Sequence, residues 1–342
     1  MSQHPFRAAC TPIVQRALLV LGGAFLLFAP PAGAGRVRPQ TSGPVFEAFS
    51  IPSVAAGRVR CVATDPASRL VAVVSDGQGL TVVDLDTQRS RTLRFSGVAY
   101  SVLVSGEIVY VAETTTSGLL SLQAIDAAKT KSSLSVTQTI ALPGTFEGYE
   151  GKSGLDDWML YVPGSTAGLQ MVDVSRAAYP RYVGATWTSF GVMQVDASDH
   201  RAAVLSTGGS RFALFDTSQP SAPKVLYSGP YSGVDVATSG GLVLMQGSGV
   251  QLLDFSQPSS PRVLAVSSLG SPSNGNFEFW GSEVVEFPTS QSIRVYRQNP
   301  PLELIGEAAL DWVIYGKAWA SDPGRIYAVD RSGTLHALER NF

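Results

Sequence analysis

The sequence predicts an all-β fold: a seven-bladed β-propeller with four antiparallel strands in each blade. The main observation is a pair of short apolar segments that recurs seven times along the 342 residues. These segments are rich in β-branched residues and are bounded by Gly, Ser, Asp and Pro, which is typical of strands. Charged residues make up only 15% of the chain, well below the usual share of about 25%. A ring of sheets that bury both faces leaves few positions for charge.

The first segment of each repeat is an apolar run that we expect to form the second strand of a blade. Its copies begin at Arg69, Glu107, Trp158, Arg201, Gly241, Ser282 and Arg325. The mean spacing, about 43 residues, lies in the range of propeller blades. A four-stranded sheet of this size cannot bury its faces alone, so the sheets must pack against one another.

The second segment predicts the third strand of a blade, and in five copies it ends in Asp. These residues are Asp84, Asp126, Asp173, Asp216 and Asp254. We expect each carboxylate to accept hydrogen bonds from the following turn and so to fix the chain reversal. Segments that follow Pro180, Pro223 and Pro261 predict the fourth strand. Proline suits a strand at the edge of a sheet, because no neighbour there needs its missing amide hydrogen.

The N-terminal region predicts export. Residues 1–34 resemble a cleaved signal peptide, with two arginines, an apolar run over 17–28 and the small residues Ala32-Gly33-Ala34. A transmembrane helix needs roughly 20 apolar residues, so we expect no stable membrane span after cleavage. We therefore expect a periplasmic or extracellular protein. The one cysteine beyond the leader, Cys61, lies in an apolar run, which favours a buried and unreactive thiol.

We expect a short linker over residues 35–44 and a single propeller domain over residues 45–342. The seventh repeat ends at Phe342, directly after its third strand. Residues 45–51 (VFEAFSI) alternate apolar positions, so we expect this segment to complete the last blade. Such closure would protect an open sheet edge. We also expect the protein to be a monomer.

Three central repeats resemble the LVIVD-repeat β-propeller family. Residues 168–184, 212–223 and 249–262 follow its pattern Gly-Leu-x-Ile-Val-Asp-x-Ser-Asp-Pro-x-x-Pro, whereas the match is weak after residue 275. The last repeat, residues 325–338, looks more like a quinoprotein-type blade. The resemblance implies an exported bacterial or archaeal propeller. It implies little about activity, because propellers host many functions.

Composition and motifs exclude several function classes. The net charge of −2 is unlike that of a protein held by nucleic-acid phosphates. The sequence has no Gly-x-Ser-x-Gly elbow, no phosphate-binding loop and no EF-hand pattern. Only His200 and His336 lie beyond the leader, and neither has neighbours at metal-ligand spacing. We therefore predict neither a metal site nor a cofactor. His336 alternates with leucines of the last strand, which favours a structural role.

One segment stands out in this charge-poor chain. Four carboxylates and Tyr149 cluster where the third repeat is lengthened; the carboxylates are Glu147, Glu150, Asp156 and Asp157. The corresponding connections of other repeats carry Tyr100, Phe190, Tyr231, Phe277, Asp311 and Trp312. Together these residues predict an aromatic, mildly acidic funnel at the channel mouth that binds a sugar, a peptide or a cation. The alternative is that the aromatic rings pack between blades. The adjacent Asp156 and Asp157 are a weak candidate for calcium.

The preferred functional interpretation is an exported, non-catalytic binding or scaffold protein. It would present a loop face and a central channel to a protein, glycan or surface ligand. The alternative is a metal-dependent, lactonase-like hydrolase with a site in the channel. That enzyme needs carboxylates converging near the axis, for which Glu150, Asp235 and Asp311 are the candidates. A quinone-dependent oxidoreductase has the least support.

Overall fold

The computed structural model describes residues 45–340, apart from residues 147–150, 166, 187, 207–209, 232, 248–249, 268–275, 299–301 and 323. The predicted signal peptide (1–34) and linker (35–44) lie outside the described residues. No helix among the described residues is long and apolar enough to cross a membrane.

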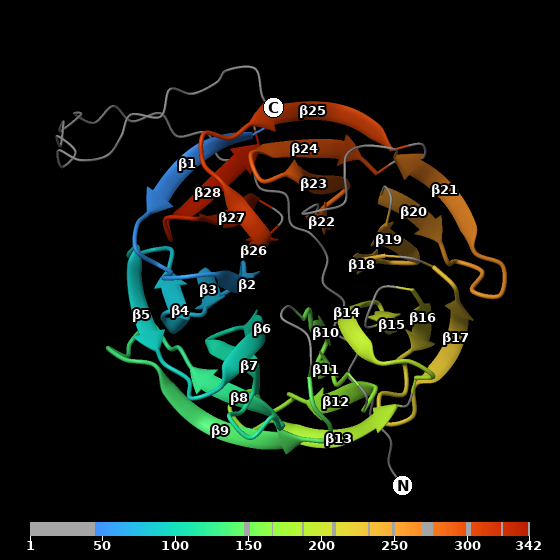
Figure 1. Ribbon diagram of the computed structural model, residues 1–342, viewed down its shortest axis with the longest axis horizontal. Coiled ribbons are helices and arrows are strands. Elements are labelled where there is room, and N and C mark those ends of the chain that lie inside the picture. Colours follow the sequence, from blue (N-terminus) through green and yellow to red (C-terminus); the bar gives the residue numbers. More distant parts are fainter. Residues whose placement is uncertain are drawn as a thin grey trace, which may run out of the picture. The chain divides into compact units, whose positions relative to one another are not determined.

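The described chain forms seven four-stranded antiparallel sheets arranged as a ring (Figure 1). The predicted β-propeller is thus confirmed. The inner strands are β2 (Val59–Asp65), β6 (Val98–Ser105), β10 (Gly154–Asp156), β14 (Val192–Ser198), β18 (Asp235–Ser239), β22 (Asn276–Trp280) and β26 (Ile314–Ser321). The second strands are β3 (Leu70–Ser75), β7 (Ile108–Thr114), β11 (Met159–Pro163), β15 (Arg201–Ser206), β19 (Leu242–Gln246), β23 (Glu283–Thr289) and β27 (Arg325–Asp330).

The outer half of each blade follows the same order. The third strands are β4 (Gly79–Asp84), β8 (Leu120–Asp126), β12 (Leu169–Asp173), β16 (Phe212–Asp216), β20 (Val250–Asp254), β24 (Ser292–Arg297) and β28 (Leu335–Arg340). The outer strands are β5 (Arg89–Leu93), β9 (Ser135–Leu142), β13 (Arg181–Thr186), β17 (Lys224–Gly229), β21 (Arg262–Ser267), β25 (Glu303–Ala309) and β1 (Val45–Ile51). Each repeated apolar run therefore forms a second strand. Pro180, Pro223 and Pro261 each precede an outer strand, as predicted.

The hydrophobic core is divided among the interfaces between neighbouring blades. Seven clusters of buried residues occur among the described residues, and each joins two adjacent sheets. One of them packs Val73 and Val83 of the first blade against Tyr327 and Val329 of the last, so the ring is closed. Both faces of the sheets are covered in this way. That accounts for the continuous apolar runs and for the scarcity of charge.

The N-terminal strand β1 completes the last blade by pairing with β28 (Figure 1). A charged cluster reinforces this pairing: the His336 ring lies between Glu47 of β1, 3.1 Å from Nδ1, and Asp330 of β27, 3.0 Å from Nε2. Trp312 stacks on the His336 ring with centroids 4.1 Å apart. Burial disfavours a charged imidazole, but the two carboxylates outweigh it and raise the pKa of His336.

The repeated Asp at the end of the third strand caps the following turn, as predicted. In all five copies Oδ1 accepts a hydrogen bond from the backbone N–H two residues later, at 2.7 to 2.9 Å. In two blades the second oxygen also pairs with an arginine of the outer strand, in Asp173–Arg181 and Asp254–Arg262. These carboxylates therefore build the turns.

Candidate functional site

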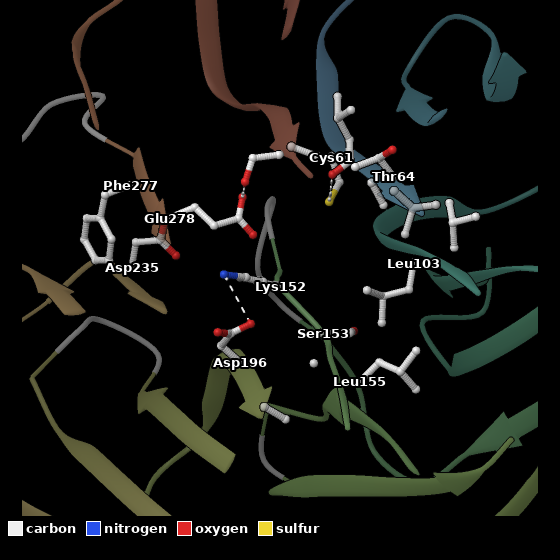
Figure 2. Close-up of a pocket in the computed structure, with 18 residues that line it drawn as sticks. Cys61, Thr64, Leu103, Lys152, Ser153, Leu155, Asp196, Asp235, Phe277 and Glu278 are labelled. Carbon is white, nitrogen blue, oxygen red and sulfur yellow. Dashed lines mark hydrogen bonds and ion pairs between the residues drawn. The ribbon is translucent and has the colours of Figure 1, made fainter. Parts of the chain in front are cut away.

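The candidate site is the central cavity of the ring, which has a volume of about 270 Å³ (Figure 2). Residues from the inner part of all seven blades line it. The lining residues form a charged side and an apolar side. Charged groups come from Lys152, Asp196, Asp235 and Glu278, whereas Val62, Val102, Leu103, Val104 and Leu155 are apolar. The carboxylates extend from β14, β18 and β22, and the apolar side chains from β2, β6 and β10.

Lys152 enters the cavity because two glycines let its segment pass between neighbouring strands. A Cβ atom on Gly151 would lie 2.7 Å from the Tyr100 ring, and one on Gly154 would lie 2.6 Å from the backbone nitrogen of Ala197. Neither position can hold a larger residue without displacing these neighbours. The segment is also bonded to β14, since the Val195 N–H donates to the Lys152 carbonyl at 2.9 Å.

The Lys152 ammonium is held by two oxygens of neighbouring blades. Its Nζ lies 3.3 Å from Oδ1 of Asp196 and donates to the Val236 carbonyl at 3.2 Å (Figure 2). The other oxygen of Asp196 accepts from the Thr238 N–H at 2.6 Å, which fixes the carboxylate across the blade boundary. Burial disfavours the ammonium, but Asp196, Glu278 and Asp235 together raise the pKa of Lys152. The lysine therefore stays charged.

Glu278 is a charged group of the cavity with a single, long hydrogen bond among the described residues. The Ser321 hydroxyl, at 3.4 Å, is the one hydrogen-bond donor to its carboxyl among the described residues. Burial raises the pKa of Glu278 to about 7, and the negative charges of Asp196 and Asp235 act in the same direction against Lys152. Glu278 therefore titrates near neutral pH. Among the described lining residues, three carboxyl groups thus share the cavity with one ammonium group.

Of the aromatic residues predicted for a funnel, Phe277 lines this cavity, whereas Tyr100 and Trp312 do not. Tyr100 is only 1% exposed, stacks on Phe146 with ring centroids 3.9 Å apart, and donates a hydrogen bond to the Pro163 carbonyl. Trp312 is buried in the core cluster between the last two blades and stacks on His336. Both rings thus follow the alternative that was left open, which is packing between blades.

The other predicted residues that the structure describes lie at separate places in the ring. Phe190 and Tyr231 are partly buried and pack on the clusters between blades 3 and 4 and between blades 4 and 5, respectively. Asp311 is exposed in the turn before β26. Glu147, Tyr149 and Glu150 lie outside the described residues.

Asp156 and Asp157 lie at the end of β10 that is remote from the connection between blades. Asp156 accepts a hydrogen bond from the His200 N–H at 2.7 Å, in the next blade. Asp65–Gly106 and Asp199–Gly240 make the same contact elsewhere, so this Asp links neighbouring blades. Asp156, Asp157 and His200 could together hold a metal ion. In the described part of the chain they are the one group of three His, Cys, Asp or Glu side chains whose possible metal-ligand atoms all lie within 4.8 Å of one another.

The sequence interpretation missed Lys152, Asp196 and Glu278, whereas it had named Asp235 as a channel candidate. A shared pattern could have revealed the carboxylates. Each lies between two apolar residues in or at the start of the first strand of a repeat, in Val195-Asp196-Ala197, Val234-Asp235-Val236 and Phe277-Glu278-Phe279. A charge inside an apolar alternation marks a place where a buried strand faces a cavity. No comparable sequence pattern marks Lys152.

Comparison with known proteins identifies the fold alone. No protein-family model and no curated protein sequence matches the chain. Among solved structures, BamB from Moraxella catarrhalis superposes with a TM-score of 0.57 at 15% identity, covering 86% of this chain and 99% of that one. The computationally designed Ika8 protein superposes with a TM-score of 0.57 at 10% identity, covering 82% and 83% of the two chains. Many other solved chains also match, so the fold by itself does not select a function.

Proposed function

We propose that this chain is an exported, non-catalytic binding propeller that holds its ligand in the central cavity. The observation that carries the proposal is the cavity itself, which combines a charged side and an apolar side from inner strands of different blades. Ligand sites are commonly concave and largely apolar, with a few placed polar groups that fix orientation.

Export is supported by the leader at residues 1–34 and by the likeness of the central repeats to the LVIVD family. Expression in a bacterial host tests this part of the proposal. We expect the mature protein in the periplasm or the medium, with Gly35 as its N-terminal residue by mass spectrometry. An intact leader on a cytoplasmic product would contradict it.

Ligand capture by the cavity is tested with a labelled mature chain on glycan and peptide arrays. Leu103→Trp partly fills the cavity, because Leu103 lines it. Val136→Trp on the outer strand of the same blade is the matched control, since Val136 is 44% exposed. We expect binding to a protein or glycan probe that Leu103→Trp abolishes and Val136→Trp preserves, with both variants folded by circular dichroism. Binding that survives Leu103→Trp would place the ligand elsewhere and refute the proposal.

The second candidate is the metal-dependent hydrolase, which the convergence of Asp196, Asp235 and Glu278 favours. Two observations weigh against it. Lys152 already places a positive charge among these carboxylates, and the three do not bring their oxygens within 4.8 Å of one another as a group. Calorimetric titration with calcium decides between the two functions. A tight, stoichiometric calcium site abolished by Asp235→Asn would favour the enzyme.

A further inference from the structure

We propose that the ligand of the central cavity is an organic cation with an aliphatic stem, an alkylguanidinium or alkylammonium group. The inference rests on the proposed function and gives the ligand its chemistry. Such a group is found in free polyamine-like molecules and in the basic side chain of a peptide. The argument combines the charge of one side of the cavity, the apolar character of the other, and the cavity's size.

Among the described residues, the charged side carries more carboxylates than ammonium groups. The carboxylates belong to Asp196, Asp235 and Glu278, and the one ammonium group, of Lys152, is paired with Asp196. Charges enclosed in a low-dielectric interior are costly unless they are paired. A second cation would pair with the Glu278 carboxyl, which has only the Ser321 hydroxyl as a donor among the described residues. Lys152 shows that the site accommodates an ammonium group.

The apolar side selects the remainder of the ligand. Leu103 and Leu155 lie across the cavity from Glu278 and Asp235, with Lys152 between the two sides (Figure 2). Long basic groups place their methylene stems on apolar surface and their charged heads in polar surroundings. The volume of about 270 Å³ is below that of sites for drug-sized ligands, roughly 300–1,000 Å³. It suits a ligand no larger than one long side chain.

The affinity should depend on pH through Glu278. Among the described residues, the groups that face it are Lys152, Asp196, Asp235 and the Ser321 hydroxyl. A cation binds the ionised carboxyl, and ionisation is about half complete near pH 7. Binding should therefore strengthen about tenfold between about pH 6 and about pH 8, because the ionised fraction rises by that factor. At about pH 6 binding should also release a proton.

The test is calorimetric titration of the full mature chain with agmatine at both pH values. Uncharged butylurea controls for the charge, methylguanidinium controls for the stem, and the peptide Gly-Gly-Arg-Gly-Gly separates a side-chain source from a free small molecule. Glu278→Gln removes the titrating charge. Glu303→Gln in the outer strand of the same blade is the matched control, because Glu303 has a 61% exposed side chain outside the cavity.

We expect agmatine or the peptide to bind about tenfold more tightly at the higher pH, and Glu278→Gln to weaken binding at least tenfold there and abolish the pH dependence. Glu303→Gln should behave as wild type. Leu155→Ala should weaken agmatine and leave methylguanidinium unchanged, which keeps the test valid if Glu278→Gln is unstable. Equal binding of butylurea, or no binding of any cationic probe at millimolar concentration, would overturn the inference. If the arrays then still show a ligand that Leu103→Trp abolishes, the proposed function stands without it.

Discussion

Aspartates at the end of the third strands stabilise this fold one turn at a time. Asp216 is representative, since its Oδ1 accepts the Ser218 N–H at 2.9 Å. The same carboxyl lies opposite Lys224 in the strand register. Hydrogen bonding by Ser218 is the largest cause that lowers the pKa of Asp216, and Lys224 adds to it. The bond to the turn, more than the charge, should carry the stabilising effect.

Substitution at Asp216 separates the two contributions. Asp216→Ala removes the acceptor and should lower the free energy of unfolding by about 1 kcal/mol. Asp216→Asn keeps an acceptor oxygen in the same place and should cost much less. Urea denaturation of the three proteins measures the difference. Equal losses for Ala and Asn would show that the negative charge matters instead.

His336 links β1 to the rest of the last blade through charge. Burial disfavours ionisation of Glu47 and Asp330, but hydrogen bonds outweigh it and lower the pKa of both. For Glu47 the first of these bonds comes from His336; for Asp330 Ser332 contributes first and His336 next. The imidazole pKa is raised in return. The cluster therefore contains one cation and two anions over a limited pH range.

The stabilising contribution of the cluster is lost at both ends of this pH range, through different groups. The contribution of charged His336 is complete below its ordinary pKa of 6.5 and is lost as pH rises through the raised value. The contributions of Glu47 and Asp330 are complete above their ordinary values of 4.5 and 3.8 and are lost as pH falls through the lowered values. The cluster should therefore stabilise the protein most between pH 4.5 and 6.5.

His336→Gln tests this expectation. Within that window the variant should lose about 3 kcal/mol, because removing one partner of a buried ion cluster leaves the others unpaired. At alkaline pH, above the raised pKa of His336, the imidazole of the wild type is neutral and the difference should become small. Urea denaturation at both pH values measures it. A loss that stays constant with pH would show that the Trp312 stack, and not the charge, is what the histidine contributes.

At the scale of elements, β1 determines whether the ring is closed. It pairs with β28 and adds Val45 and Ile51 to two different core clusters, at the interfaces of the last blade with its two neighbours. The sequence predicted this strand because 45–51 alternates and the last repeat is one strand short. An alternation of apolar and polar residues predicts such strands well, since the side chains of a strand alternate between its two faces.

Deleting residues through Pro52 removes β1 and should lower the melting temperature by about 10 °C or more. The loss combines an opened sheet edge, two exposed core clusters and the removal of Glu47 from His336. A chain that begins at Val45 is the matched control and should melt as the mature protein does. A melting temperature unaffected by removal of β1 would refute its role in closure.

At the scale of the whole molecule, the sequence predicted the architecture far better than the site. The repeats gave the blades, the strand order and the turn-capping Asp residues, because those depend on local pattern. The site depends on packing across blades. Whether an aromatic residue such as Tyr100 faces the channel or the next blade is decided by three-dimensional contact, here with Phe146. Lys152 reaches the cavity only because Gly151 and Gly154 fit against distant strands.

The central claim is that the cavity within the ring holds a cationic ligand. A crystal structure of the mature protein with agmatine at about pH 8, where Glu278 is ionised, tests it most directly. The account predicts the guanidinium group within hydrogen-bond distance of the Glu278 carboxylate and the stem against Leu103 and Leu155, with the Lys152–Asp196 pair intact. Agmatine bound only on the outer surface, with water alone in the cavity, would contradict it.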